Sequence, residues 1–158
     1  MDSVSVFLMS IKGKVPSESI VPLQEKLEKA DENALQKLML VVLKSPIVGI
    51  VLSLLFGILG VDRFYKGDLK LGFAKLGLII ISYAILFGVV IVAASAIENT
   101  FMVSSDDVLD MIIEQYLLPF ALGIIGIVVA YIWWIVDIFL VFFGIKKDNL
   151  SKIHSALQ

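Results

Sequence analysis

Cysteine is absent from this chain of 158 residues, and histidine occurs only once, as His154. Without cysteine the chain cannot form disulfides, cysteine-ligated zinc sites, iron–sulfur clusters or a thiol nucleophile. His154 stands in a polar segment with no second histidine to share a metal ion, so we assign it to solvent. We therefore expect no metal site and no cofactor.

Common catalytic motifs are also missing. The sequence contains no G-x-S-x-G nucleophile motif and no glycine-rich phosphate-binding loop. Asp62 and Asp68 could form a metal or acid–base pair, but both stand beside basic residues, where solvated charge is the commoner role. We therefore predict that the protein is not an enzyme.

The chain also lacks an excess of positive charge. The chain has 13 basic and 15 acidic residues, a net charge of -2, and a sequence pI of about 5.3. Nucleic-acid binding needs a clustered basic surface, so we expect no nucleic-acid partner. Apolar residues are abundant instead, at 59% of the chain with a mean hydropathy of +0.97. This composition predicts an integral membrane protein in contact with a lipid bilayer.

The N-terminal residues 1–45 form a polar head that holds twelve of the 28 charged side chains. Val4–Ile11 is rich in β-branched residues and predicts a strand, and the apolar spacing over Ser19–Asp31 predicts an amphipathic helix. Leu38–Leu43 predicts a second strand, with continued helix as the alternative. A strand-helix-strand unit of this size is too small to be stable alone, so we expect it to dock on the membrane part or on another subunit.

Three apolar segments follow the head, so the predicted fold is mainly α. They predict about three membrane-buried helices near 46–61, 70–97 and 116–145, of which the second and third form a long hairpin. The first holds sixteen uncharged residues, about 24 Å of helix, so it either spans tightly or is only partly sunk. We divide the chain into the head 1–45, a membrane domain 46–147 and a polar tail 148–158.

Charge at the ends of these helices predicts their orientation in the cell membrane as a multi-pass protein. The loop 62–75 and the C-terminal tail carry lysine and arginine and should be cytoplasmic, whereas the acidic loop 98–115 should lie outside. Three full spans would place the head outside, but its six lysines argue for the inside. A first helix that enters and returns would reconcile these counts, and the side of the head stays open.

Small residues recur at helical spacing on the first and third apolar segments. Such stripes let helix backbones approach closely in lipid, and packing explains them without a ligand. Together with the small head, they predict a homo-oligomer; other protein partners stay unknown. The stripe residues are Gly49, Ser53, Gly57, Gly60, Gly123, Gly126 and Ala130.

Two motifs stand in order beside these helices. The connector contains Asp62, Arg63, Phe64, Tyr65 and Gly67, and the third helix contains Trp133, Trp134 and Asp137. Over about Pro46–Lys147 this combination resembles the TM-two domain family of small two-helix membrane modules, which have a G-x-D/H-R-F-Y-x-G connector and a W-W-x-x-D helix. The head and the segment Asn149–Ile153 resemble its bacterial single-domain branch. One departure is an insertion of roughly 40 residues before the tryptophan helix, which we interpret as a lengthened hairpin.

Asp137 is the one charge within the third apolar segment. It lies about 12 Å inside the border at Ile145, where an aspartate is costly and needs compensation. Arg63, otherwise an ordinary membrane anchor, should approach the same depth and bind Asp137 with two parallel hydrogen bonds, with Lys66 as the alternative partner. The flanking tryptophans are more typical of packing or of the membrane interface than of a ligand site.

Two functions are compatible with these features. The first is a non-enzymatic interaction or assembly module that associates with itself. The alternative is an oligomeric ion channel or transporter in which Asp137 and Arg63 line a polar path. A single deep charge favours the module.

Overall fold

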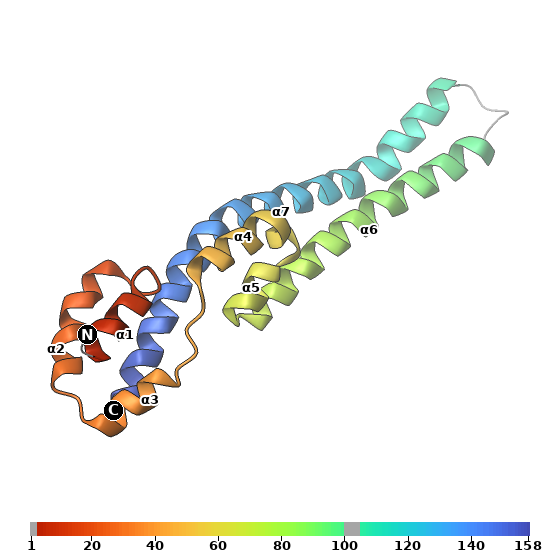
Figure 1. Ribbon diagram of the computed structural model, residues 1–158. Coiled ribbons are helices and arrows are strands. Elements are labelled where there is room, and N and C mark those ends of the chain that lie inside the picture. Colours follow the sequence, from red (N-terminus) through yellow and green to blue (C-terminus); the bar gives the residue numbers. More distant parts are fainter. Residues whose placement is uncertain (1–2, 100–104) are drawn as a thin grey trace.

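The computed structural model describes residues 3–99 and 105–158, and every regular element in these ranges is helical. The chain is elongated, with a helical head at one end and a long antiparallel hairpin at the other (Figure 1). The helix α7, Ser105–Ala156, runs through the whole length and belongs to both parts.

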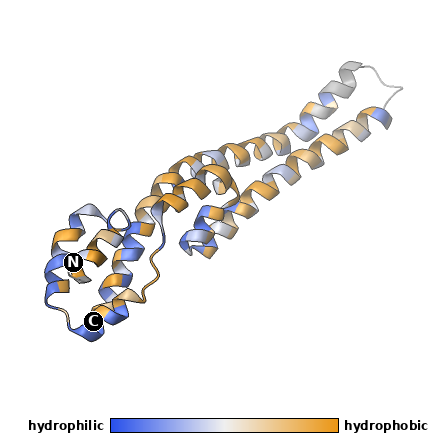
Figure 2. Cartoon of the chain, in the orientation of Figure 1, coloured by the Kyte–Doolittle hydropathy of each residue, from blue (hydrophilic) through white to orange (hydrophobic). Residues whose placement is uncertain are grey.

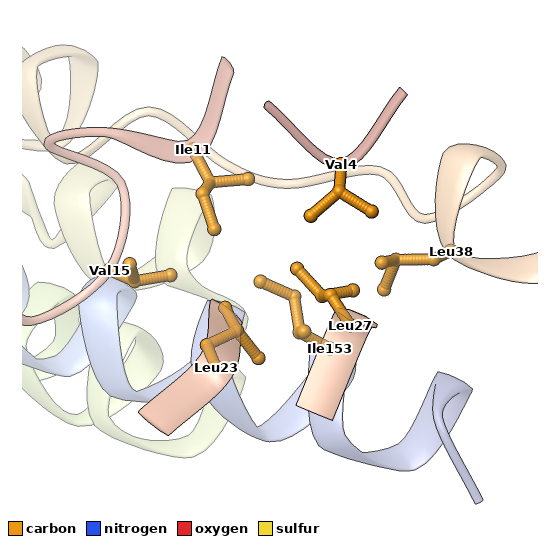
Figure 3. Packing of buried hydrophobic residues seen from close by; sticks show 7 residues of the cluster. All are labelled: Val4, Ile11, Val15, Leu23, Leu27, Leu38 and Ile153. Atoms are coloured by element: carbon orange, nitrogen blue, oxygen red, sulfur yellow. The ribbon is translucent and has the colours of Figure 1, made fainter. Parts of the chain in front are cut away.

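The head consists of α1 (Ser3–Ile11), the 3-10 turn η1 (Ser17–Ser19), α2 (Ile20–Glu28) and α3 (Glu32–Met39). These elements surround the C-terminal end of α7, which contributes Ile153 to their core. The head thus packs on a part of α7 that was assigned to the polar tail 148–158, whereas docking was expected on the membrane part or on another subunit. Figure 3 shows the core, which comprises Val4, Ile11, Val15, Leu23, Leu27, Leu38 and Ile153.

The predicted strand-helix-strand head is wrong, because the described residues contain no strand. Val4–Ile11 is helical, and Val4 and Ile11 reach the same core because seven residues make about two helical turns. Burial has overridden the β-propensity of this segment. The second predicted strand begins within α3 and then continues as the extended linker 40–45 without a ladder partner. The predicted amphipathic helix is present as α2, with Leu23 and Leu27 buried.

The first apolar segment forms a short re-entrant unit. The helix α4, Pro46–Phe56, is 11 residues long, about 16 Å, and is followed by η2 (Gly57–Leu59) and α5 (Val61–Lys66). Gly60 makes the turn between them with a φ of 79°. The Lys44 ammonium at the start of this unit donates to the carbonyls of Tyr65 and Lys66 at its end, at 2.7 and 2.9 Å. The two ends of the unit therefore lie together.

The hairpin is formed by α6, Leu69–Asn99, and α7. Both contain an apolar span long enough to cross a membrane, Leu69–Glu98 and Ile113–Ala156. Figure 2 shows hydrophobic colouring along the middle of both helices, whereas the C-terminal end of α7 in the head is largely hydrophilic. The predicted hairpin is thus present. The described chain has two candidate spans, and the expectation of about three is corrected, since α4 is too short to cross.

The predicted tail 148–158 and the predicted acidic loop 98–115 are more helical than expected. α7 continues to Ala156, so the tail 148–158 is mostly helix. In the expected acidic loop 98–115, Glu98 belongs to α6 and residues 105–115 belong to α7, while 100–104 lie outside the described residues. The division into three domains stays a prediction.

Candidate functional site

Four charged side chains meet in the interior where the re-entrant unit packs on the hairpin. α5 contributes Asp62 and Arg63, α6 contributes Lys75, and α7 contributes Asp137. Asp62, Lys75 and Asp137 are completely buried, and Arg63 is 6% exposed. Charges without water are stable only when they are paired and hydrogen-bonded, so the pairing of this cluster determines its role.

Asp137 lies at the centre of the cluster and binds two cations. The guanidinium of Arg63 donates from Nε to Oδ2 at 3.0 Å and from a second nitrogen to Oδ1. The predicted pair of Arg63 and Asp137 is confirmed, with the two parallel hydrogen bonds expected of arginine. Lys75 also donates to Oδ2, at 2.8 Å. This second partner was not predicted, because Lys75 was counted with the basic loop.

Asp62 occupies the deepest end of the cluster. Its Oδ2 accepts from the hydroxyl of Ser53 at 3.1 Å and lies 3.6 Å from the Lys75 ammonium. Its Oδ1 is buried and has no hydrogen-bond partner among the described residues. The expectation that Asp62 is a solvated charge is therefore wrong, because the turn at Gly60 directs α5 back into the protein.

Asp68 closes the outer end of the cluster. Its Oδ2 accepts from Arg63 at 3.0 Å and from Lys66 at 2.7 Å, and Lys66 also lies 3.5 Å from Asp148. Lys66, the alternative partner for Asp137, therefore serves this outer position. The hydrogen bond from Lys66, followed by that from Arg63, holds the pKa of Asp68 below its usual range. The hydrogen bond to Asp137 is the main cause that raises the pKa of Arg63.

Three acids and three bases of the resulting charge network alternate, and the exposed Asp148 adds a longer contact to Lys66 at its outer end. From the outside inwards the order is Lys66, Asp68, Arg63, Asp137, Lys75 and Asp62. Its formal charge is zero when all six groups are ionised. Among the described residues there is no group of three or more potential metal ligands. The network is therefore suited to holding α5, α6 and α7 together, since each side chain fixes a neighbour on another element or turn.

The other connector residues fix the same unit. The Phe64 ring meets Phe73 edge-on at a centroid distance of 5.0 Å, and the Tyr65 hydroxyl accepts from the Ser45 amide at 3.0 Å. Gly67 ends α5 with a φ of 110°, a conformation that favours glycine. The connector motif is thus a folding motif in this structure: it shapes the return of the chain and positions Arg63.

The two tryptophans of α7 have different surroundings. Trp134 donates from Nε1 to the Ser53 carbonyl, and its ring lies against Gly57, where an added Cβ would stand 2.6 Å from the ring. Trp133 is half-buried. Trp134 therefore has a packing role and is linked to the inner end of the charge network through Ser53.

The small residues pack helices of this one chain against each other. Gly49 lies against Ile145 and Val141 of α7, and an added Cβ on Gly60 would approach the Gly72 carbonyl to 2.7 Å. Gly123 and Gly126 lie against α6 beside Leu86 and Ser82, while Ser53 and Ala130 are completely buried. These residues consequently provide no support for association between chains.

Comparison with known families agrees with the motif. Residues 43–94 match the model of the TM2 domain family. The match contains Asp62, Arg63 and Lys75, whereas Asp137 lies beyond it on α7. No curated protein and no solved structure matches the chain. With this match and two helices able to cross a bilayer, the protein is a small membrane protein that carries a TM2 domain over residues 43–94.

Proposed function

We propose that this protein is a non-enzymatic assembly module, which anchors its helical head at a membrane surface and associates through its hairpin. The observation that carries the proposal is the charge network, in which six acidic and basic side chains pair with one another in alternation. Such a network stabilises one arrangement of helices, and the described residues contain no group of three or more histidine, cysteine or acidic side chains that could hold a metal ion.

The proposed placement is multi-pass in the cell membrane, with the head, the connector and the C-terminal end of α7 in the cytoplasm. The end of the hairpin next to the head carries the lysines, and the opposite end carries Glu98, Asp110 and Glu114. By the positive-inside rule the lysine-rich end faces the cytoplasm. Attachment of a membrane-impermeant reagent to single cysteines at Lys147 and Glu114 tests this placement, and labelling of the first from outside the cell would contradict it.

Self-association is proposed to use the outer face of α6. An added Cβ on Gly77 or Gly88 would meet nothing within 4 Å, so the backbone of α6 is uncovered there. In lipid, uncovered glycines allow another helix to approach closely. This feature supports association between chains better than the glycines that pack inside one chain.

The oligomeric mass in mild detergent and in nanodiscs tests this proposal. We expect a defined homo-oligomer that Gly88→Leu weakens or dissociates. Ala94→Leu is the matched control, because Ala94 is also exposed on α6 but lies on a different face. A monomer for the unaltered chain in both media would contradict self-association, and equal effects of the two variants would contradict the assigned face.

The alternative function is ion or proton transfer, and the continuity of the charge network favours it. The network runs from the partly exposed Asp68 to the unpartnered Oδ1 of Asp62. Among the described residues the network ends at Asp62, beside Ser53 and Trp134, and does not continue along the hairpin, which favours the assembly module over ion or proton transfer. Liposome flux measurements with the unaltered chain and Asp137→Asn separate the two functions: flux that the substitution abolishes would reverse this order, and absence of flux would support the module.

A further inference from the structure

A groove with a volume of about 610 Å³ lies between α1, the start of α2 and the end of the hairpin. Its apolar lining includes Leu8, Met9, Ile20 and Val21. Met9 and Val21 are 62% and 68% exposed, so the head leaves apolar surface uncovered here. The volume falls within the range of small-molecule sites.

Lysines Lys12 and Lys146 provide the charge of this groove. No aspartate or glutamate occurs among the described residues that line it. The Lys146 ammonium lies over the ring of Phe142, 4.3 Å from the ring centroid, which holds it at the end of the apolar segment of α7. The groove therefore combines an apolar floor with positive charge that no acid of the lining neutralises.

The position of the groove along α7 indicates what surrounds it. Ile145 ends the apolar segment, and Lys146 is the first of two consecutive lysines after it. Lysines at this point of a membrane helix lie at the level of the lipid head groups. The groove thus opens where hydrocarbon gives way to phosphate.

We propose that this groove binds an anionic phospholipid of the surrounding bilayer. One acyl chain covers the apolar floor beside Met9 and Val21, and the phosphate group lies between Lys12 and Lys146. Charge complementarity supports this occupant, since the groove lining carries two lysines and no acid, and Lys146 follows directly on the apolar segment of α7, at the level where lipid phosphates lie. The inference goes beyond the proposed assembly function and requires only that the protein lies in a membrane.

Native mass spectrometry of the full chain released from detergent micelles tests the proposal. The probes are palmitoyl-oleoyl phosphatidylglycerol and phosphatidylcholine, which share their acyl chains and differ in charge. We expect the first to bind at least about tenfold more tightly, because each lysine near an anionic lipid contributes about fivefold in affinity. Lys12→Gln with Lys146→Gln should abolish this preference.

Lys26→Gln with Lys29→Gln is the matched control, since it removes the same charge from a different surface of the head, lined by Lys26, Lys29 and His154. It should leave the preference intact, as should Lys12→Arg with Lys146→Arg. Equal losses in both glutamine pairs, or no preference in the unaltered chain, would overturn the site. A dimer that excludes lipid would also overturn it and would assign the groove to a second copy. The arginine pair separates loss of charge from misfolding, and its failure to retain the preference would count against the proposal.

Discussion

Asp137 is the residue whose loss should destabilise this fold most, because two buried cations depend on it. Asp137→Asn keeps the shape of the side chain but removes the charge that binds Arg63 and Lys75. Arg63 would retain Asp68, at 3.0 Å. Lys75 would retain only the longer contact with Asp62, at 3.6 Å, and its side chain has no access to water. The variant therefore leaves an ammonium poorly compensated in a dry site.

The expected cost follows from the pairing. Removing one member of a buried pair typically costs about 3 to 5 kcal/mol. Asp137→Asn should reach the upper end, about 5 kcal/mol, because it affects two cations. Arg63→Gln should lie near the lower end, about 3 kcal/mol, because Lys75 still binds the carboxylate. The double variant should cost about 1 to 3 kcal/mol less than the sum of the two.

Unfolding of the purified chain in mild detergent, followed by circular dichroism against a denaturant, measures these free energies. Asp148→Asn is the control, since Asp148 pairs with Lys66 at 3.5 Å but its side chain is 51% exposed. Exposed pairs contribute at most about 1 kcal/mol, so this variant should differ little from the unaltered chain. Strictly additive losses, or a larger loss for Arg63→Gln than for Asp137→Asn, would refute the assignment of Asp137 as the shared centre.

Three further predictions test other parts of the structure by the same unfolding measurement or by proteolysis. Gly60→Ala should destabilise the chain by about 1 to 3 kcal/mol, since the φ of Gly60 is positive and a Cβ there would meet a backbone carbonyl of α6. Gly88→Ala is the control and should be neutral or slightly stabilising, because a Cβ at Gly88 would meet nothing within 4 Å. Because the pKa of Asp68 is lowered in the folded state, its ionised form stabilises the fold above the ordinary aspartate pKa, and this stability is lost as pH falls through the lower folded value. Asp68→Asn should therefore reduce the loss of unfolding free energy on acidification. An unchanged loss would contradict the role of Asp68. Asn149→Asp removes two hydrogen bonds of 2.8 Å that fix the head and its linker, so limited proteolysis should cut the linker faster; unchanged cleavage would show that other contacts hold it.

The pair of Arg63 and Asp137 could be predicted because the sequence shows both the isolated charge of Asp137 and the position of Arg63 after a short apolar segment. A charge in an apolar segment needs a partner, and helix length places Arg63 at a similar depth. Lys75 and Asp62 escaped prediction because a hydropathy pattern assigns charged residues between apolar segments to a solvated loop. The sequence spacing could have indicated the burial of Lys75. It stands four residues before Ile79, so both side chains lie on the same face of α6, and both are buried.

The error in the head has a related cause. A short run of β-branched and aromatic residues fits a half-buried strand, and periodicity alone does not separate it from a short buried helix. What decides between them is the shape of the surface that covers the run. Here that surface is formed by helices, and it includes Ile153 from a segment that the sequence assigned to a polar tail. Contacts over such a separation leave no local pattern.

The shared core of the head and α7 bears on the lysine counts that conflicted in the sequence, and it supports the proposed placement of the head in the cytoplasm. Val4 and Ile153 pack in one cluster, so the proposed placement requires the head and the end of α7 to lie on the same side of the membrane. If α6 and α7 each cross once, the segment that joins the head to α6 must cross an even number of times. α4 is too short for a crossing, and Lys44 binds the carbonyls of Tyr65 and Lys66 where α5 returns. A re-entrant connector satisfies the parity, places the lysines of the head beside those of α7, and explains why Arg63 and Asp62 are buried rather than solvated.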